Sequence, residues 1–154
     1  MVSGNADGPY RFEHAVSSTE LIVLAATGNQ ERLFLRGLNP TGNHTLDEAR
    51  RRRLDQYLMG ADLYLWKDTS QRSNGHLSAV VLTPTVRFVS HDLDAGERVE
   101  KDAHYVVIQA LTLELGEALL DRTDHEYSFY KDFLRCESRA RQKRNGYWKN
   151  APEK

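Results

Sequence analysis

Short apolar runs separated by turn residues characterise the first part of the chain. The runs Glu20–Ala25, Arg32–Leu38 and Asp62–Trp66 have the length and the apolar content of β-strands. Thr27-Gly28-Asn29 lies between the first two runs and predicts a hairpin turn. The pattern therefore predicts two paired strands, followed by a third strand further along the chain.

A second turn, Ser73-Asn74-Gly75, precedes the apolar run His76–Leu82, which predicts a fourth strand. The run Thr85–Val89 favours a continuation of that strand beyond Pro84. Because proline cannot donate a ladder hydrogen bond, this continuation would suit a sheet edge or a bulge. The segment Pro84–Ala103 could form a lid, an interface or a plain loop, and the sequence leaves these alternatives open.

Helical signals separate and follow the strands. Thr45-Leu46-Asp47-Glu48 fits a capping box, and Gly60 suits a left-handed helix end, which together predict a helix over Leu46–Met59. The region His104–Leu115 is ambiguous, since its valines favour a strand while Leu111, Leu115 and Ala118 keep helical spacing.

A further capping box, Thr123-Asp124-His125-Glu126, predicts a C-terminal helix that continues to Asn145 and stops at Gly146. The apolar face of this helix would consist of Phe129, Phe133, Cys136 and Ala140. Cys136, the only cysteine, lies on that face and is expected to be a buried structural thiol.

These elements predict a mostly β, α+β domain, a small barrel or sandwich with about three helices at one end. With 154 residues and 40% hydrophobic content, the chain is expected to form one domain over residues 11–150. Residues 1–10 are predicted to be a flexible leader and residues 151–154 a frayed tail. Since no secretory signal or membrane-length apolar run is visible, we expect an intracellular protein without membrane contact.

Charge is unevenly distributed, although the formal net charge is only −1. Arg50 to Arg53 form an unbroken run of arginines. In the segment from Lys131 to Lys149, most of the charged residues are basic. Acidic residues are concentrated in the segments 92–102 and 114–126. Such local basic regions in a neutral protein permit an anionic partner without requiring one.

The order of these features resembles that of the staphylococcal-nuclease-like family over about Val16 to Trp148. Arg36-Gly37-Leu38-Asn39-Pro40 is similar to the family's Arg-Gly-Ile-Asp-Ala-Pro-Glu with one residue deleted. The other matching landmarks, in chain order, are Ser17–Leu21, Glu48-Ala49, Tyr57–Leu65, Gly75–Val81, Leu113–Ala118 and Gln142–Trp148. The resemblance implies an OB-type five-stranded barrel with about three helices beside it.

Family chemistry is metal-assisted phosphodiester cleavage by carboxylates that bind Ca²⁺, a Glu that orients water and two arginines. By the resemblance, the metal carboxylates would fall on Thr19 and Asn39, and the Glu on Thr41. The two arginines would fall on Phe34 and His76. Since every matched position lacks the required group, we expect a catalytically inactive protein with no metal and no cofactor.

Two alternatives could rescue activity. Asp47 or Glu48 could replace the missing Glu, although helix capping and the ion pairs Glu48–Arg52 or Asp47–Arg51 also explain them. His76 could act in acid–base chemistry or bind a metal together with His44, although an ordinary surface histidine is the favoured interpretation. A divergent metal-dependent nuclease therefore remains the least favoured hypothesis.

Basic and aromatic residues supply the candidate binding surface. Lys131, Arg135, Arg139 and Lys143 are spaced four apart and would form one slanting row on a helix, which could follow a phosphate backbone. A solvated outer face would explain the same spacing. Several aromatic residues could stack bases, although aromatic residues at such positions are more often core or cap residues; they are Phe88, Tyr127, Tyr130, Tyr147 and Trp148. The candidate nucleic-acid contacts are Arg36, Arg50, Arg51, Lys131, Arg135, Arg139 and Lys143.

These observations predict a catalytically inactive binding or scaffolding module whose ligand is RNA or single-stranded DNA. The alternative is a protein-interaction subunit of a larger complex, whose basic helix meets an acidic partner. The near-neutral charge and the acidic segment 92–102 favour this alternative slightly. Strong salt dependence of nucleic-acid binding would separate the two hypotheses.

Overall fold

The computed structural model describes residues 6–73, 75–84 and 105–150. Its main element is a mixed sheet with the strand order β6-β7-β3-β2-β1-β5-β8-β9. The strands are β1 (Ala6–Ala15), β2 (Glu20–Leu24), β3 (Gln30–Leu35), β5 (Asp62–Trp66), β6 (Gln71–Ser73), β7 (His76–Ala79), β8 (Val81–Pro84) and β9 (Tyr105–Val107). A separate ribbon pairs β4 (Leu38–Asn39) with β10 (Leu119–Leu120).

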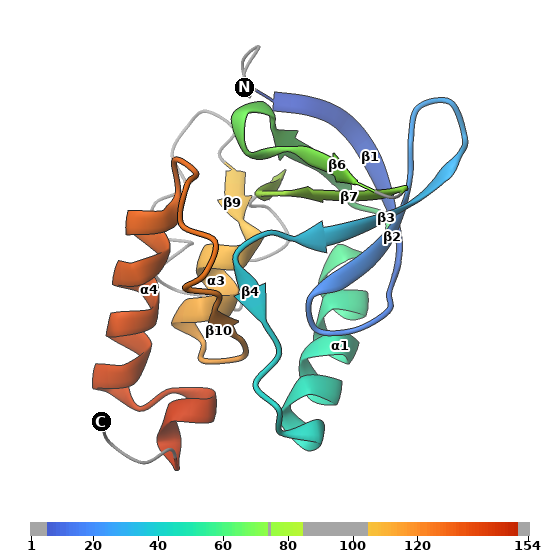
Figure 1. Cartoon of the computed structure of the whole chain (residues 1–154). Helices are drawn as coiled ribbons and strands as arrows, with labels where there is room; N and C mark the ends of the chain where they lie inside the picture. Colours follow the sequence, from blue (N-terminus) through green and yellow to red (C-terminus); the bar gives the residue numbers. More distant parts are fainter. Residues whose placement is uncertain (1–5, 74, 85–104, 151–154) are drawn as a thin grey trace.

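Three α-helices accompany the sheet in the described ranges: α1 (His44–Leu58), α3 (Ile108–Glu114) and α4 (Tyr130–Lys143). Two short 3₁₀ turns, η1 (Lys67–Thr69) and η3 (Gly146–Lys149), complete the elements. Figure 1 shows α1 on one side of the molecule and the α3–α4 pair on the other, with β4 and β10 between them. No helix in the described ranges has the length and apolar content that a membrane crossing requires.

The fold class needs a correction. The domain is α+β, as expected, but its sheet is open and has eight strands, so the predicted closed five-stranded barrel is wrong. Among the described strands, β6 and β9 form the two edges, and only β3 and β7 pair in parallel. Several strands escaped detection because they are short or polar. β6, for example, is Gln-Arg-Ser with every side chain exposed.

β1 begins at Ala6, inside the segment that the sequence assigned to a flexible leader. It pairs with both β2 and β5, so residues 6–10 belong to the sheet. Only Tyr10, Phe12 and Ala15 of this strand are buried. Gly8, Pro9 and the intervening polar residues hid that sparse apolar pattern from sequence reasoning.

The predicted strand His76–Leu82 is divided into β7 and β8 at Val80. The Val80 carbonyl accepts from the Trp66 amide at 2.9 Å, and the Val80 amide donates to Thr69 Oγ1 at 2.9 Å. β7 pairs with β3 while β8 pairs with β5, so this stretch joins two distant parts of the sheet. The predicted continuation over Thr85–Val89 and the segment 85–103 lie outside the described residues.

The helix ends differ from those predicted. α1 is capped by Asn43, whose side chain accepts from the Leu46 amide at 3.1 Å, and Gly60 after the helix is left-handed as expected. The capping box at Thr123–Glu126 does not open a helix, because Asp124 binds Arg36 and α4 begins only at Tyr130. The ambiguous region 104–115 contains both predicted elements, β9 followed directly by α3.

The core lies between the inner face of the sheet and the helices. Alternate residues of the central strands point inward, for example Leu33 and Leu35 of β3, as the two-residue strand period requires. The helices contribute residues spaced three or four apart, including Leu54 and Leu58 of α1 and Phe133 and Ala140 of α4. Cys136 belongs to this core, as predicted, and burial raises the pKa of its thiol to about 11.

Candidate nucleic-acid interface

Phe34 on β3 and His76 on β7 occupy the positions that the resemblance assigns to catalytic arginines. Their ring centroids lie 5.4 Å apart, and the rings meet edge to face. Leu33 precedes Phe34, Leu77 follows His76, and both leucines are buried on one face of the sheet. Because successive side chains of a strand alternate, Phe34 and His76 both point to the opposite face. This pair offers no guanidinium with which to neutralise a phosphoryl transition state.

Thr41 and Asp47 close the loop before α1. The Thr41 hydroxyl donates to Asp47 Oδ1 at 2.7 Å, and the Thr41 amide donates to the same oxygen at 2.9 Å. The Gly42 amide donates to Asp47 Oδ2 at 3.2 Å. The Asp47 carboxylate is therefore engaged in holding the loop, which supports its interpretation as a structural residue.

Thr19 and Asn39 occupy the positions that the resemblance assigns to metal-binding carboxylates. Asn39 is exposed on β4, and the Thr19 carbonyl accepts the Leu35 amide at 2.9 Å. Within residues 6–73, 75–84 and 105–150, no group of three His, Cys, Asp or Glu side chains is placed to hold a metal ion.

Glu48 pairs with both Arg51 and Arg52 on the surface of α1. Hydrogen bonding from Arg51, with a further contribution from Arg52, lowers the pKa of Glu48 to about 2. Such a carboxylate accepts a proton poorly near neutral pH, so it is a weak candidate for a general base. The predicted Glu48–Arg52 pair is present, whereas Arg51 pairs with Glu48 and Asp55 in place of Asp47.

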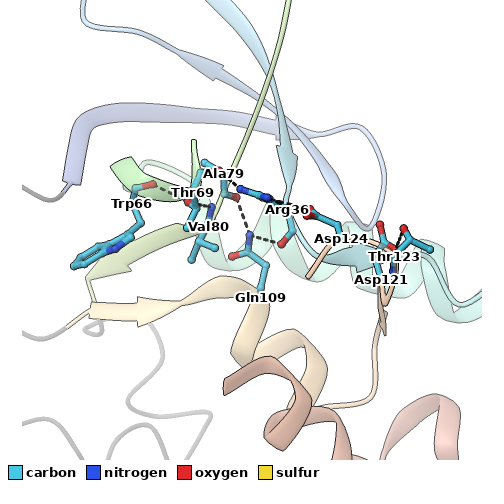
Figure 2. A network of polar contacts seen from close by, with 9 residues as sticks. All are labelled: Arg36, Trp66, Thr69, Ala79, Val80, Gln109, Asp121, Thr123 and Asp124. Atoms are coloured by element: carbon cyan, nitrogen blue, oxygen red, sulfur yellow. Dashed lines mark hydrogen bonds and ion pairs between the residues drawn. The ribbon is translucent and has the colours of Figure 1, made fainter. Parts of the chain in front are cut away.

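Arg36, one of the predicted nucleic-acid contacts, lies inside a polar network (Figure 2). Its Nε and Nη2 atoms donate to the two oxygens of Asp124 at 2.8 and 2.9 Å, and Nη1 donates to the Thr69 carbonyl at 2.8 Å. The guanidinium also lies 4.6 Å from the centre of the Tyr127 ring. Since this buried cation is satisfied by the protein, it is unavailable to a ligand.

Arg50, a second predicted contact, is only 1% exposed. Its guanidinium pairs with Glu117 at 2.9 Å and donates to the Thr112 hydroxyl. Burial lowers the pKa of Arg50, and the neighbouring Glu117 opposes that effect. Arg53 also pairs with Glu117, so this cluster joins α1 to the turn after α3. These arginines are structural.

Two of the four cations in the predicted row on α4 are neutralised by nearby carboxylates. Arg135 pairs with Asp132, and Arg139 pairs with Glu114 of α3. Lys131 and Lys143 are exposed and have no ion pair within the described part of the chain. These two lysines stand about 18 Å apart at opposite ends of the helix. The predicted continuous row is therefore reduced to two separated charges.

A different group of cations follows Glu137. Residues 138–150, here called the C-terminal basic segment, contain Arg139, Arg141, Lys143, Arg144 and Lys149 and no Asp or Glu. Arg141, Lys143 and Lys149 are exposed. Arg141 and Lys143 leave α4 in nearly opposite directions, so the charges surround the end of the helix. A negative helix terminus favours cations in its last turn, but it does not account for Lys149, which lies beyond α4.

Two half-buried aromatic residues lie among these cations. The Arg141 guanidinium is 4.7 Å from the centre of the Trp148 ring, a cation–π distance. The Tyr147 ring meets Trp148 edge to face, with centroids 5.0 Å apart. Trp148 Nε1 is buried without a hydrogen-bond partner among the described residues. Cationic and aromatic groups are thus held together at one site.

The main chain fixes the position of this site. The Tyr147 amide donates to the Gly116 carbonyl at 2.8 Å, and the Asn145 side chain donates to the Glu114 carbonyl at 2.8 Å. A Cβ atom at Gly116 would overlap the Asn145 backbone, and one at Gly146 would overlap the Gly116 backbone. η3 is therefore packed tightly against the turn that follows α3.

The sequence contained a signal for this site that the four-residue spacing obscured. The basic residues of the segment were visible, as were Tyr147 and Trp148, but the regular row drew attention to Arg135 and Arg139. The informative signal is the absence of acid between Glu137 and Glu153, because a cation with no carboxylate nearby in the sequence is more available to an anion.

Comparison with known proteins adds no family assignment to this geometry: no protein-family model matches the chain, and no curated protein sequence matches it.

Proposed function

We propose that this chain is a non-catalytic nucleic-acid-binding module that contacts RNA or single-stranded DNA through its C-terminal basic segment. The observation that carries the proposal is the set of exposed cations in a segment without carboxylates, beside Tyr147 and Trp148. Lysines and arginines bind nucleic acid by displacing counterions from phosphates. The non-catalytic part is supported by the Phe34–His76 pair and by the structural use of Asp47 and Glu48.

Binding of labelled single-stranded RNA and DNA tests the proposal, measured by fluorescence anisotropy at about 50 mM and about 200 mM salt. The test variant is Lys143→Gln with Lys149→Gln. The control, Arg11→Gln with Lys67→Gln, removes the same charge from exposed positions that also form no ion pair with another described residue. The test variant should bind about tenfold or more weakly at the lower salt, while the control should bind nearly as the original does.

Equal weakening by the two variants would show that only net charge matters and would refute the assigned site. Absence of binding by the original chain at low salt would refute the function. The same samples, incubated with Ca²⁺ or Mn²⁺ and separated on a gel, should contain intact strands. Shortened strands would show a divergent nuclease instead.

A protein partner is the second candidate, and it has its own supporting observation. Ile22, Phe34 and His76 lie half-buried on the outer face of neighbouring strands β2, β3 and β7, and the exposed Arg32 lies between Ile22 and His76. This face therefore offers a protein partner both apolar and charged contacts. If nucleic acid does not bind, crosslinking and mass spectrometry should identify a partner, and Ile22→Lys should weaken its binding.

A further inference from the structure

The Arg141–Trp148 pair suggests how the C-terminal basic segment would treat the bases of its ligand. We propose that Trp148 is a base-stacking platform that gives this segment a preference for single strands over duplexes. The inference rests on the proposed function, because it concerns the same site. It adds a specificity-determining residue and a class of ligand conformation.

The orientation of Trp148 supports a stacking role. Its Nε1 atom is buried, and the Tyr147 ring meets the indole edge to face with centroids 5.0 Å apart, so packing restricts the orientation of the ring. The guanidinium over the ring face belongs to Arg141, whose side chain is exposed. An exposed side chain can move at little cost, and its movement would uncover that face for a base.

A nucleotide can replace the contact between Arg141 and Trp148 and still give each group a partner. Arg141 stacks on Trp148 in the free protein, and a nucleotide offers a flat base for the ring together with a phosphate for the guanidinium. Lys149 follows Trp148 directly and offers a second phosphate contact. A duplex would satisfy only the phosphate contacts, because its bases remain stacked on one another. The ring therefore distinguishes single strands from duplexes, while the cations do not.

A rigid support makes this distinction possible. The backbone of η3 is hydrogen-bonded to the Gly116 carbonyl. It packs so closely against Gly116 that neither Gly116 nor Gly146 has space for a Cβ atom. The platform therefore does not need to be ordered when a ligand binds, which reduces the entropic cost of stacking.

Intrinsic fluorescence tests the inference directly. In a Trp66→Phe background, Trp148 is the only tryptophan in the chain. We expect a single-stranded oligonucleotide to quench Trp148 strongly, and an abasic strand of equal length to quench it little. The abasic strand should also bind about tenfold more weakly, since it has the phosphates but no bases. A duplex of the same sequence should resemble the abasic strand.

Arg141→Gln provides a second measurement that does not disturb the platform. It should retain the quenching while reducing affinity and salt dependence, because the ring remains and one phosphate contact is lost. Trp148→Phe should keep most of the preference for single strands, whereas Trp148→Leu should abolish it, provided that both variants unfold at temperatures close to that of the original.

The outcomes separate this inference from the proposed function. Equal affinity for single strands, abasic strands and duplexes, without quenching, would overturn the stacking role and leave electrostatic nucleic-acid binding intact. Failure of every strand to bind at low salt would overturn both.

Discussion

Arg36 and Asp124 are separated by 88 positions in the chain and form a two-pronged ion pair, with N–O distances of 2.8 and 2.9 Å. Arg36 lies directly after β3, and Asp124 lies in the loop before α4. The pair therefore attaches the C-terminal helical part of the molecule to the sheet. The Arg36 side chain is 6% exposed and that of Asp124 is 33% exposed, so the cation depends more than the carboxylate on its partner.

Asp124→Ala should lower the free energy of unfolding by about 2 kcal/mol. The change leaves the buried Arg36 without its carboxylate, and the partial exposure of Asp124 reduces the cost below that of a fully buried pair. Urea unfolding at neutral pH measures the effect. Glu126→Ala, at an exposed neighbouring position, is the control and should change little. Equal effects would contradict a special role for the pair.

Acid should remove the contribution of Asp124 to stability. Hydrogen bonding from Arg36 holds the pKa of Asp124 below its ordinary value of 3.8. A carboxylate whose pKa is lower in the folded state contributes stability above its unfolded pKa and loses that contribution as the pH falls through its folded pKa. The difference in unfolding free energy between the original and Asp124→Asn should therefore be constant near neutral pH and shrink below about pH 4. A difference that persists unchanged into stronger acid would contradict this assignment.

Gln109→Met should destabilise the protein by about 2–4 kcal/mol. The Gln109 side chain is fully buried, accepts from the Val81 amide at 3.1 Å, and donates to the carbonyls of Ala79 and Arg36 (Figure 2). Methionine has a similar volume but leaves these backbone groups without their partner. Thermal or urea unfolding checks the result, and Gln142→Met on the exposed side of α4 is the matched control.

Glu117→Ala should be more damaging than Arg50→Met. Removing Glu117 leaves the buried Arg50 cation without a carboxylate, which costs about 3–5 kcal/mol. Arg50→Met removes the buried charge itself and keeps an apolar side chain in its place, so the loss should be smaller. Urea unfolding of both variants gives the order. The reverse order would show that packing by Arg50, and not its charge balance, dominates.

Arg144→Gly should stabilise the protein by about 0.5–1 kcal/mol. Arg144 ends α4 in the left-handed conformation, with φ 57° and ψ 46°, which glycine adopts more easily. The same substitution at Arg135, within the helix, should destabilise by about 1 kcal/mol. Under the proposed function, Arg144→Gly should also weaken nucleic-acid binding, so stability and affinity should change in opposite senses. Thermal unfolding and anisotropy measure the two quantities.

Millimolar Ca²⁺ should leave the unfolding temperature unchanged. A cation that binds only the folded state would raise that temperature by mass action, and the positions that the sequence resemblance assigns to carboxylates are occupied by Thr19, Asn39 and Thr41. Mg²⁺ at the same ionic strength is the control for general salt effects. A rise specific to Ca²⁺ would require a metal site and would return the divergent nuclease to consideration.

The elements that were predicted correctly from the sequence are those with a strong local pattern. β5 has the predicted bounds, the Thr27–Asn29 turn joins β2 to β3, and α1 lies close to its expected range. These elements have continuous apolar runs or clear helix ends. The strands that were missed have few buried residues, and their order in the sheet depends on contacts between distant segments, which local patterns do not contain.

The candidate site was predicted only in part, for an electrostatic reason. A sequence shows where cations occur but not which carboxylates fold against them. Arg36, Arg50 and Arg139 are paired with acids located 88, 67 and 25 positions away. The remaining available charge therefore depends on tertiary structure. Helical spacing alone predicted a row of four cations on α4, of which the fold neutralises two.

Because Gly116 and Gly146 are in close contact, the position of the C-terminal basic segment depends on the backbone, whereas its charge depends on the side chains. Two glycines and the backbone carbonyls of Glu114 and Gly116 set its place, so neither Lys143 nor Lys149 is required to hold it there. Relatives could therefore exchange these side chains freely and tune affinity, or lose it, on an unaltered scaffold. A homologue with a larger residue at either glycine would have to move the whole segment, and with it any ligand.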